Sequence, residues 1–491
     1  MTTAPPADAP VDAVVFEPAA LLDTSGPGAV PRRGARRLVA ALAAHGVPAH
    51  VRQAGGTGEA AGTVALAAQL GETGLAPHAQ LLAEGRDPEG RVLSVLAAPP
   101  APGGTPIAPT GPVVTIGDEE DVHQAVLRAL TGEVGALAAA SLLVAPPDAD
   151  SVAAARDRHL ALTKPPGSLG RLEDVGCQLA GIAAAVPPPV PGPAAVAVFA
   201  GDHGVHAQGV TPWPQEVTAQ MVANFARGGA AINVLAGHAG ARVVVVDVGV
   251  AADLPAELDA SPVIRRRRVR AGTADLSTGP AMSPAEAREA LDVGAETAAR
   301  LVADGARCLV TGDMGIANTT PSAALVAALA GRPAEGVTGR GTGVDDATLG
   351  RKAAIVAAAA ARAHAEHGDD ALAVLAEVGG LEHAALAGFI IGGAALQVPV
   401  VIDGVIAAAA LLVAARLVPG VEACVIAGHR SVEPGASAVL EELGLAPMVD
   451  LGLRLGEGTG AALALPLVES AALVLRDMAT FDEAGVTDKA D

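Results

Sequence analysis

Four short clusters with catalytic or turn-forming residues follow apolar runs of the sequence, at the point where each run ends. They are GDHG at 201–204, GDMG at 312–315, DG at 403–404 and GHRS at 428–431. One such cluster is typical of an ordinary turn, where Gly and Asp suit the backbone geometry. Four of them after four buried runs favour a ligand pocket at one edge of a sheet.

A glutamate surrounded by glycines is a candidate general base. Glu457 stands in RLGEGTG at 454–460, just before a helix that we expect to begin near Ala461. The positive end of a helix dipole favours a carboxylate, while apolar neighbours such as Leu455 raise its pKa toward neutrality. A charged residue that only caps the helix fits the same position, so the position alone leaves both interpretations open.

Phosphate binding is a second candidate chemistry. The sequence contains no GxxxxGK[ST] and no GxGxxG between a strand and a helix, but GIANTTP at 315–321 runs into an Ala-rich helix. Its backbone N–H groups and dipole could cradle a phosphate. An ordinary helix start, with Thr320 as the cap and Pro321 as the first helical residue, is compatible with the same pattern.

Lys352 is one of only three lysines among 32 basic residues, and it stands near the start of a long helix. A compact ammonium suits a phosphate or carboxylate, although a solvated helix residue is an equal alternative.

Asp202, His203 and His206 lack a third well-spaced ligand, so we expect no metal there. The run at 265–268 (RRRR) is expected to be a mostly solvated strand.

Five Val/Ala/Ile/Leu runs are expected to form the strands that position these residues, most of them separated by helical stretches. They lie at 195–200, 242–248, 306–311, 400–402 and 421–427. Continuous apolar strands alternating with helices predict an α/β fold with a doubly wound parallel sheet. Ligands bind beyond the carboxyl ends of such strands.

Composition limits the classes of partner. Acidic residues outnumber basic ones by 53 to 32, a formal charge of -21, which argues against nucleic acid and anionic membranes. The N-terminus lacks the pattern of a secretory signal, which predicts a cytoplasmic protein. The apolar stretch 384–402 contains Gln397 and Pro399, and we expect a buried helix followed by a buried strand. The three scattered cysteines are expected to be core residues.

The length of 491 residues predicts more than one domain, with a boundary near residue 145. Residues 1–145 are predicted to form an extra N-terminal α/β module, and residues 146–491 contain every candidate site. A Pro/Gly/Ala-rich run at 98–112 interrupts the module. Strand-like pieces at 13–16 and 112–116 alternate there with helix-like pieces at 35–44 and 120–130, and none carries a chemical motif.

From about Leu162 to the C-terminus the chain resembles the nicotinate-nucleotide:dimethylbenzimidazole phosphoribosyltransferase family. The matching segments are LTKPPGSLGRLE (162–173), FAGDHGV (199–205), GVTPWPQEVTAQMVANF (209–225), GDMGIANTTPSAAL (312–325), GRGTGVDD (339–346), PVVIDGVI (399–406), AGHRSVEPG (427–435) and RLGEGTGAALALPL (454–467). Eight segments in the same order make the resemblance highly specific.

The resemblance implies a homodimer with a Rossmann-like sheet and a smaller helical subdomain built from both ends of the transferase region. It implies transfer of the phosphoribosyl group of nicotinate mononucleotide to 5,6-dimethylbenzimidazole or a similar flat base. The products are α-ribazole 5′-phosphate and nicotinate, formed with inversion at the anomeric carbon during assembly of the cobalamin lower ligand. No metal or organic cofactor is implied.

The resemblance also implies residue roles. Glu457 falls on the family's general base, which takes the benzimidazole proton. The benzimidazole slot corresponds to Trp213, Met221 and Leu455, and the phosphate and nicotinate side to Asp313, Gly315, Asn318, Lys352 and Ser431. Many relatives carry Glu where Asp313 stands, and the shorter side chain changes its reach toward Lys352 or the substrate.

Two other functions remain as alternatives. A nucleotide-binding regulatory protein could keep the pocket without the activity, and the intact RLGEG segment at 454–458 argues against it. A nicotinamide-dependent dehydrogenase would need the missing GxGxxG.

Overall fold

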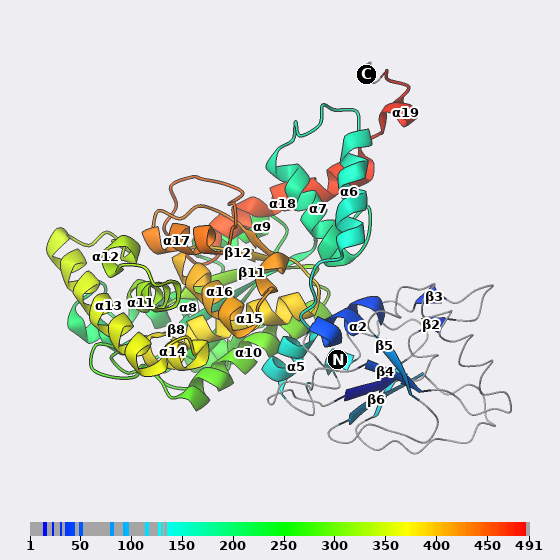
Figure 1. Ribbon diagram of the computed structural model, residues 1–491. Coiled ribbons are helices and arrows are strands. Elements are labelled where there is room, and N and C mark those ends of the chain that lie inside the picture. Colours follow the sequence, from blue (N-terminus) through cyan, green and yellow to red (C-terminus); the bar gives the residue numbers. More distant parts are fainter. Residues whose placement is uncertain are drawn as a thin grey trace. The chain divides into compact units, whose positions relative to one another are not determined.

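The computed structural model describes residues 135–487 continuously (Figure 1). It also describes 13–16, 22–23, 30–31, 35–44, 49–52, 79–82, 92–97, 113–116, 126–128 and 131. The chain divides into two compact units, Met1–Pro146 and Pro147–Asp491.

The N-terminal unit contains a parallel five-stranded sheet in the order β5-β4-β1-β6-β7. Its strands are β1 (Ala13–Phe16), β4 (Ala49–Arg52), β5 (Ala79–Leu82), β6 (Val92–Ala97) and β7 (Val113–Ile116). A short antiparallel pair, β2 (Leu22–Asp23) with β3 (Val30–Pro31), and helices α2 (Ala35–Ala44) and α5 (Ala136–Leu143) complete its described elements. The run at 98–112 and most of 120–130 lie outside the described residues.

The second unit is built on a parallel six-stranded sheet in the order β10-β9-β8-β11-β12-β13. Its strands are β8 (Ala194–Gly201), β9 (Arg242–Gly249), β10 (Ile264–Arg266), β11 (Cys308–Met314), β12 (Val400–Ile402) and β13 (Val425–Ala427). Numbered within the unit, this is the doubly wound order 3-2-1-4-5-6, which reverses between β8 and β11. The predicted parallel sheet is therefore confirmed.

Helices cover both faces of this sheet (Figure 1). One face is packed by α8 (Val217–Ala226), α9 (Ala231–His238) and the first part of α18 (Thr459–Asp477). The other is packed by α15 (Leu381–Ala395) and α16 (Val405–Leu417), with α10 (Pro284–Ala303) against α15. The remaining main helices are α11 (Thr319–Ala330), α12 (Ala334–Val337), α13 (Asp346–His367), α14 (Ala371–Val378) and α17 (Pro434–Glu442).

Small residues let the layers approach closely, which explains how a core with so few aromatic residues is filled. A Cβ atom at Gly294 of α10 would lie 1.8 Å from the Ala385 carbonyl oxygen of α15, and one at Gly388 would lie 1.9 Å from the Leu291 carbonyl oxygen. The two helix backbones therefore touch through glycine. The apolar stretch 384–402 is the buried end of α15 followed by the buried strand β12, as predicted.

A smaller helical subdomain projects from the sheet (Figure 1). It consists of α6 (Ala149–Ala161), α7 (Arg171–Ala183), the end of α18 and α19 (Phe481–Ala484). The Thr163 amide donates to the Ala479 carbonyl over 3.1 Å, so both ends of the unit meet there, as expected. Among the described residues, α18 alone is long and apolar enough to cross a membrane, but more than half of its apolar window is buried within the protein.

Three boundaries predicted from the sequence are wrong. Strand β11 runs from Cys308 to Met314 and not from 306 to 311, so the first three residues of the GDMG cluster belong to the strand. Residues 421–424 form a 3-10 helix, and only Val425–Ala427 are strand. Helix α11 begins at Thr319, with Asn318 as its N-cap, so Thr320 lies inside the first turn and Pro321 is not the first helical residue. The Thr320 hydroxyl is buried and caps nothing.

We expect a chain beginning at Pro147 to fold on its own, because the sheet, its covering helices and the subdomain all come from the second unit. Asp148 would still cap α6 by accepting from the Ser151 amide over 2.8 Å. Circular dichroism should show a cooperative thermal transition close to that of the full chain. An aggregated product, or one without a cooperative transition, would contradict the boundary.

Candidate active site

A cavity of about 350 Å³ opens at the carboxyl ends of β11, β12 and β13, beside the point where the strand order reverses. The structure brings all nine predicted site residues to its wall. They are Asp313, Gly315 and Asn318 from the end of β11 and the start of α11, Trp213 and Met221 from around α8, Lys352 from α13, Ser431 from the loop after β13, and Leu455 and Glu457 from the segment before α18. Their roles stay predictions.

Glu457 lies in a left-handed turn whose backbone is tightly packed. Gly456, Glu457 and Gly458 have φ of 85°, 65° and 95°. A positive φ is unusual for a residue with a Cβ and persists only where surrounding contacts hold it. One such contact comes from β11, because a Cβ atom at Gly312 would lie 2.5 Å from the Glu457 carbonyl oxygen. The glycine at 312 is therefore required for close approach.

The Glu457 side chain is 6% exposed, and its carboxylate contacts α9 rather than α18, the helix that follows it in the chain. Its Oε2 accepts from the Ile232 amide over 3.3 Å, in the first turn of α9. Burial raises the pKa of Glu457, the Ile232 amide opposes this rise, and the negative charge of Asp403 adds to it. Leu455, the neighbour expected to desolvate this carboxylate, is itself 59% exposed. The Gly458 and Ala461 amides at the start of α18 donate to Asp403. The effect of the α18 dipole on Glu457 stays a prediction.

Lys352 lies in the cavity wall with its ammonium almost fully buried. Nζ donates to Thr319 Oγ1 and to the Gly339 carbonyl, both over 3.0 Å. Burial lowers the pKa of Lys352, and the nearby charge of Glu433 opposes the change. This arrangement excludes the alternative of a solvated helix residue.

Asp313 does not pair with Lys352. Its Oδ2 instead accepts from Asn318 Nδ2 over 3.0 Å, while Oδ1 is buried without a hydrogen bond. Burial and the negative charges of Asp403, Glu382 and Glu457 raise the pKa of Asp313 well above its ordinary value, against the Asn318 hydrogen bond. The surroundings of Asp313 therefore favour its neutral form more than water does.

The cavity is also lined by three charged residues to which the sequence analysis assigned no role. Glu433 Oε1 accepts from the Gly341 amide over 2.7 Å, and Arg454 Nη1 donates to the Gly341 carbonyl over 2.9 Å. Arg340 lines the same wall and pairs with Asp346. All three stand in the quoted GRGTGVDD, AGHRSVEPG and RLGEGTG segments, which is the signal that could have identified them. Ser431 Oγ accepts from the Glu433 amide over 3.3 Å.

The apolar wall is more open than the polar one. Trp213 is 49% exposed and Leu455 is 59% exposed, whereas Met221 on α8 is partly buried. The wall therefore presents flat and flexible apolar surface at the cavity, which suits an aromatic ring.

The other candidates lie outside the cavity. Asp202 is buried and accepts from Thr218 Oγ1 over 2.7 Å and from the Ala251 amide over 2.8 Å. These hydrogen bonds connect the end of β8 to α8 and to the loop after β9, so Asp202 has a structural role. His203 Nε2 lies 3.0 Å from Glu382 Oε1 in a fully buried pair. His206 is bonded to the Trp213 carbonyl over 2.9 Å.

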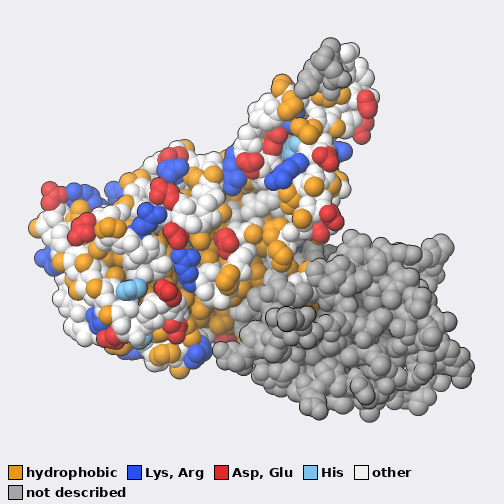
Figure 2. Space-filling view, viewed as in Figure 1, with side chains coloured by type: hydrophobic (Ala, Val, Ile, Leu, Met, Phe, Trp, Pro, Cys, Tyr) orange, Lys and Arg blue, Asp and Glu red, His pale blue; other side chains and the backbone are white. Residues whose placement is uncertain are grey.

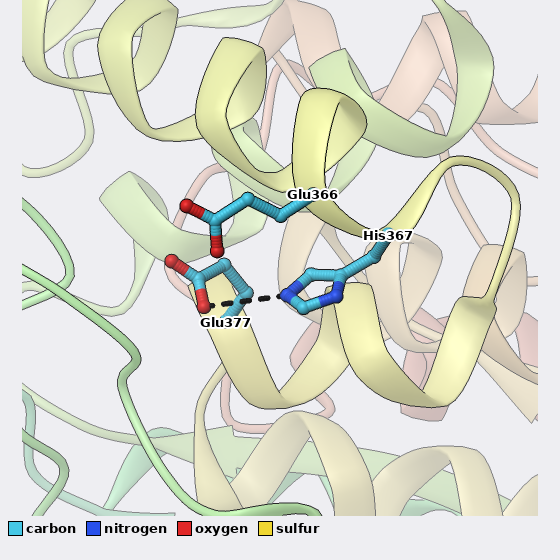
Figure 3. Close-up of side chains that lie close together, drawn as sticks. All are labelled: Glu366, His367 and Glu377. Atoms are coloured by element: carbon cyan, nitrogen blue, oxygen red, sulfur yellow. Dashed lines mark ion pairs between the residues drawn. The ribbon is translucent and has the colours of Figure 1, made fainter.

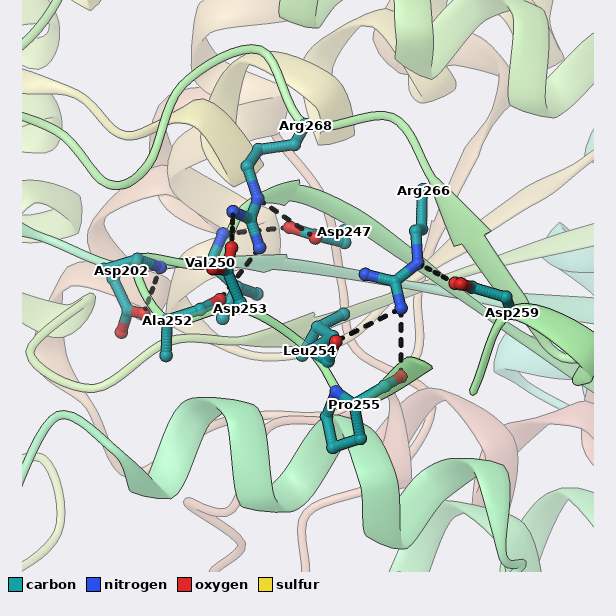
Figure 4. A network of polar contacts seen from close by, with 11 residues as sticks. Asp202, Asp247, Val250, Ala252, Asp253, Leu254, Pro255, Asp259, Arg266 and Arg268 are labelled. Atoms are coloured by element: carbon teal, nitrogen blue, oxygen red, sulfur yellow. Dashed lines mark hydrogen bonds and ion pairs between the residues drawn. The ribbon is translucent and has the colours of Figure 1, made fainter. Parts of the chain in front are cut away.

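Three of the four arginines at 265–268 pair with acidic residues, while Arg265 donates to the carbonyls of Pro262 and Ile264. Arg266 donates to Asp259, and Arg268 reaches Asp247 over 3.3 Å and Asp253 over 3.1 Å (Figure 4). On the face drawn in Figure 2, basic and acidic side chains are interspersed over the second unit. Nearby acidic side chains therefore neutralise most of the positive charge of this run, which begins in the edge strand β10.

Within the described part of the chain, Glu366, His367 and Glu377 have the spacing of potential metal ligands (Figure 3). Both carboxylate oxygens of Glu377 are already engaged, one by the Arg362 guanidinium and the other by His367 Nε2 at 3.5 Å. The group lies at the ends of α13 and α14, outside the cavity. It is explained as an ion-pair cluster.

Comparisons with known proteins place this site in a family. The model of a phosphoribosyltransferase family matches residues 144–486. The chain belongs to this phosphoribosyltransferase family. Nicotinate-nucleotide–dimethylbenzimidazole phosphoribosyltransferases of Salinispora tropica and Chloroflexus aurantiacus are 56% and 54% identical to it, each over 70% of the chain and 98% and 97% of their own lengths.

A solved structure supports the same assignment. The crystal structure of CobT from Thermus thermophilus matches with a TM-score of 0.67 and 51% identity, over 69% of this chain and all of that one. The family match begins at residue 144, so the N-terminal unit of this phosphoribosyltransferase lies almost entirely outside it.

The raised pKa of Glu457 gives a stability prediction. The folded state holds the Glu457 proton more tightly than the unfolded chain, so this carboxyl group lowers the free energy of unfolding as pH rises above 4.5. Glu457→Gln removes that penalty and keeps an oxygen for the Ile232 amide. We expect its melting temperature to equal or exceed that of the wild type near pH 8, with the difference vanishing near pH 4.

Calorimetry at both pH values measures this difference. A variant clearly less stable than the wild type near pH 8 would show that Glu457 serves mainly as a cap of α9.

Proposed function

We propose that this enzyme transfers the phosphoribosyl group of nicotinate mononucleotide to 5,6-dimethylbenzimidazole, with Glu457 as the general base. Curated relatives of this name match nearly their whole length at 56% and 54% identity. The observation that carries the proposed mechanism is the buried Glu457 carboxylate of raised pKa, which lines the same cavity as the apolar wall and the buried ammonium of Lys352.

The chemistry needs one proton acceptor. Glu457 takes the N–H proton of the benzimidazole while the other ring nitrogen forms a bond to the anomeric carbon of the ribose. The bond from that carbon to the pyridinium nitrogen breaks, and its electron pair neutralises the ring, so nicotinate leaves without a general acid. A base works best when its pKa approaches the working pH, which is the direction in which burial shifts Glu457.

The apolar wall is proposed to hold the attacking base. Trp213, Met221 and Leu455 offer a flat apolar slot for a fused aromatic ring beside the glutamate. Because such a slot recognises shape rather than a set of polar groups, it suits related flat bases as well as dimethylbenzimidazole.

The polar wall is proposed to hold nicotinate mononucleotide. Lys352 supplies a buried positive charge for its phosphate, beside the N-terminus of α11 and Ser431. Gly315 and Asn318 border the same region, together with Asp313, which accepts from Asn318 Nδ2. Bound substrate is thereby oriented for attack at one face of the ribose.

We also propose a homodimeric, cytoplasmic enzyme. The half-exposed Trp213 and the exposed Leu455 border the cavity, where a second subunit could cover apolar surface.

The activity test combines both substrates with the full-length protein and measures α-ribazole 5′-phosphate by mass spectrometry. Glu457→Gln retains the shape of the base but cannot accept the proton, so kcat should fall by roughly 10² to 10⁴ with little change in KM. Absence of product from the folded wild type would favour a binding protein without activity. A Gln variant with near wild-type kcat would remove Glu457 from the mechanism.

A further inference from the structure

The left-handed turn at Glu457 needs a contact that fixes its direction. The Ile232 amide holds the carboxylate over 3.3 Å, and Gly312 packs against the backbone, but neither contact fixes the following residues of the turn. Gly458 also has a positive φ and leads directly into α18. Two glycines beside the glutamate make other backbone conformations accessible, so the observed one must be selected by its surroundings.

Asp403 provides such a contact from the end of β12. Its Oδ2 accepts from the Gly458 amide over 3.1 Å, and its Oδ1 accepts from the Ala461 amide over 3.0 Å. The side chain is fully buried, and His429 Nε2 lies 3.5 Å from Oδ1. One carboxylate therefore joins the residue after Glu457 to the first turn of α18.

The position of Asp403 is itself fixed by the sheet. Its backbone amide donates to Thr311 Oγ1 of β11 over 3.0 Å. The same strand carries Gly312, which packs against the Glu457 carbonyl. Neighbouring strands thus hold both sides of the turn, and Asp403 does so without itself lining the cavity.

We propose that Asp403 is a positioning residue for the transfer reaction, which holds the 456–458 turn so that the Glu457 carboxylate faces the cavity. This inference rests on the proposed role of Glu457 as the base. It gives the DG cluster at 403–404 a function that the site description leaves open.

The alternative is that Asp403 only caps α18 and contributes to stability. A cap predicts a lower melting temperature with unchanged turnover, because an N-cap acts on the helix alone. A positioning residue also predicts a lower kcat, because a small displacement of a catalytic group is costly to the reaction. KM should stay nearly constant, since Asp403 does not line the cavity.

Asp403→Asn tests the two interpretations, because the amide keeps the size of the side chain but can accept only one of the two N–H groups well. We expect kcat to fall by roughly 10² and the KM of each substrate to change by less than about threefold. Asp247→Asn is the matched control. Asp247 is equally buried and accepts from the Val250 amide over 2.9 Å at the end of β9, away from the cavity. It should lose stability with kcat unchanged.

A double-mutant cycle decides whether Asp403 acts through Glu457. In a Glu457→Gln background, Asp403→Asn should reduce kcat by less than about threefold, because the group that it positions no longer takes the proton. A full reduction in that background, or an unchanged kcat in the single Asp403 variant, would overturn the proposal. Near wild-type turnover of Glu457→Gln alone would instead overturn the proposed base, so the two failures are distinguishable.

If Asp403→Asn does not fold, Thr311→Val takes its place. Valine has nearly the shape of threonine but removes the acceptor of the Asp403 amide. We expect kcat to fall about tenfold with unchanged KM. A folded Thr311 variant with wild-type kcat would overturn the proposal.

Discussion

A carboxylate removed from water must be compensated by its surroundings, and this constraint organises the carboxyl edge of the sheet. Asp313, Asp403 and Glu457 are all buried there, in a chain that is already strongly acidic. Asp403 is compensated by backbone amides of α18 and by His429. Glu457 receives one amide, and Asp313 receives one side-chain amide. Burial raises the pKa of all three carboxyl groups, and the two that line the cavity, Asp313 and Glu457, have the fewest compensating hydrogen bonds.

The fold supplies the compensation through its layers. Reversal of the strand order between β8 and β11 opens a crevice, and helices from both faces begin there. Close packing of small residues brings the backbones near enough for their amides to donate hydrogen bonds to the Glu457 and Asp403 carboxylates. The glycine at 312 shows this most directly, because any side chain there would displace the backbone of the base.

Much of this architecture could be predicted from the sequence, since apolar runs and glycine-rich ends are local signals. The strands, the convergence of four clusters at one edge and the nine residues of the cavity wall follow from them and from the family resemblance. The partner of Glu457 could not be predicted, because Ile232 is 225 residues away in the chain. The cap predicted at Thr320 is wrong because α11 begins before it, at Thr319. The loop before α11 is bound to α8 by the Ile316 amide, which donates to Thr218 Oγ1, and this long-range contact has no local signal in the sequence. Residues 1–145 carry no chemical motif from which a function could be argued.

The central claim is that a desolvated Glu457 accepts the proton, and the pH dependence of kcat at saturating concentrations of both substrates tests it most directly. Burial raises the pKa of this carboxyl above 4.5, so the wild-type rate should fall on the acidic side of a pKa higher than that of an ordinary glutamate. The account predicts that Glu457→Gln removes this acidic limb and leaves a low rate independent of pH in that range. An acidic limb at the same pH in both proteins would show that another group accepts the proton.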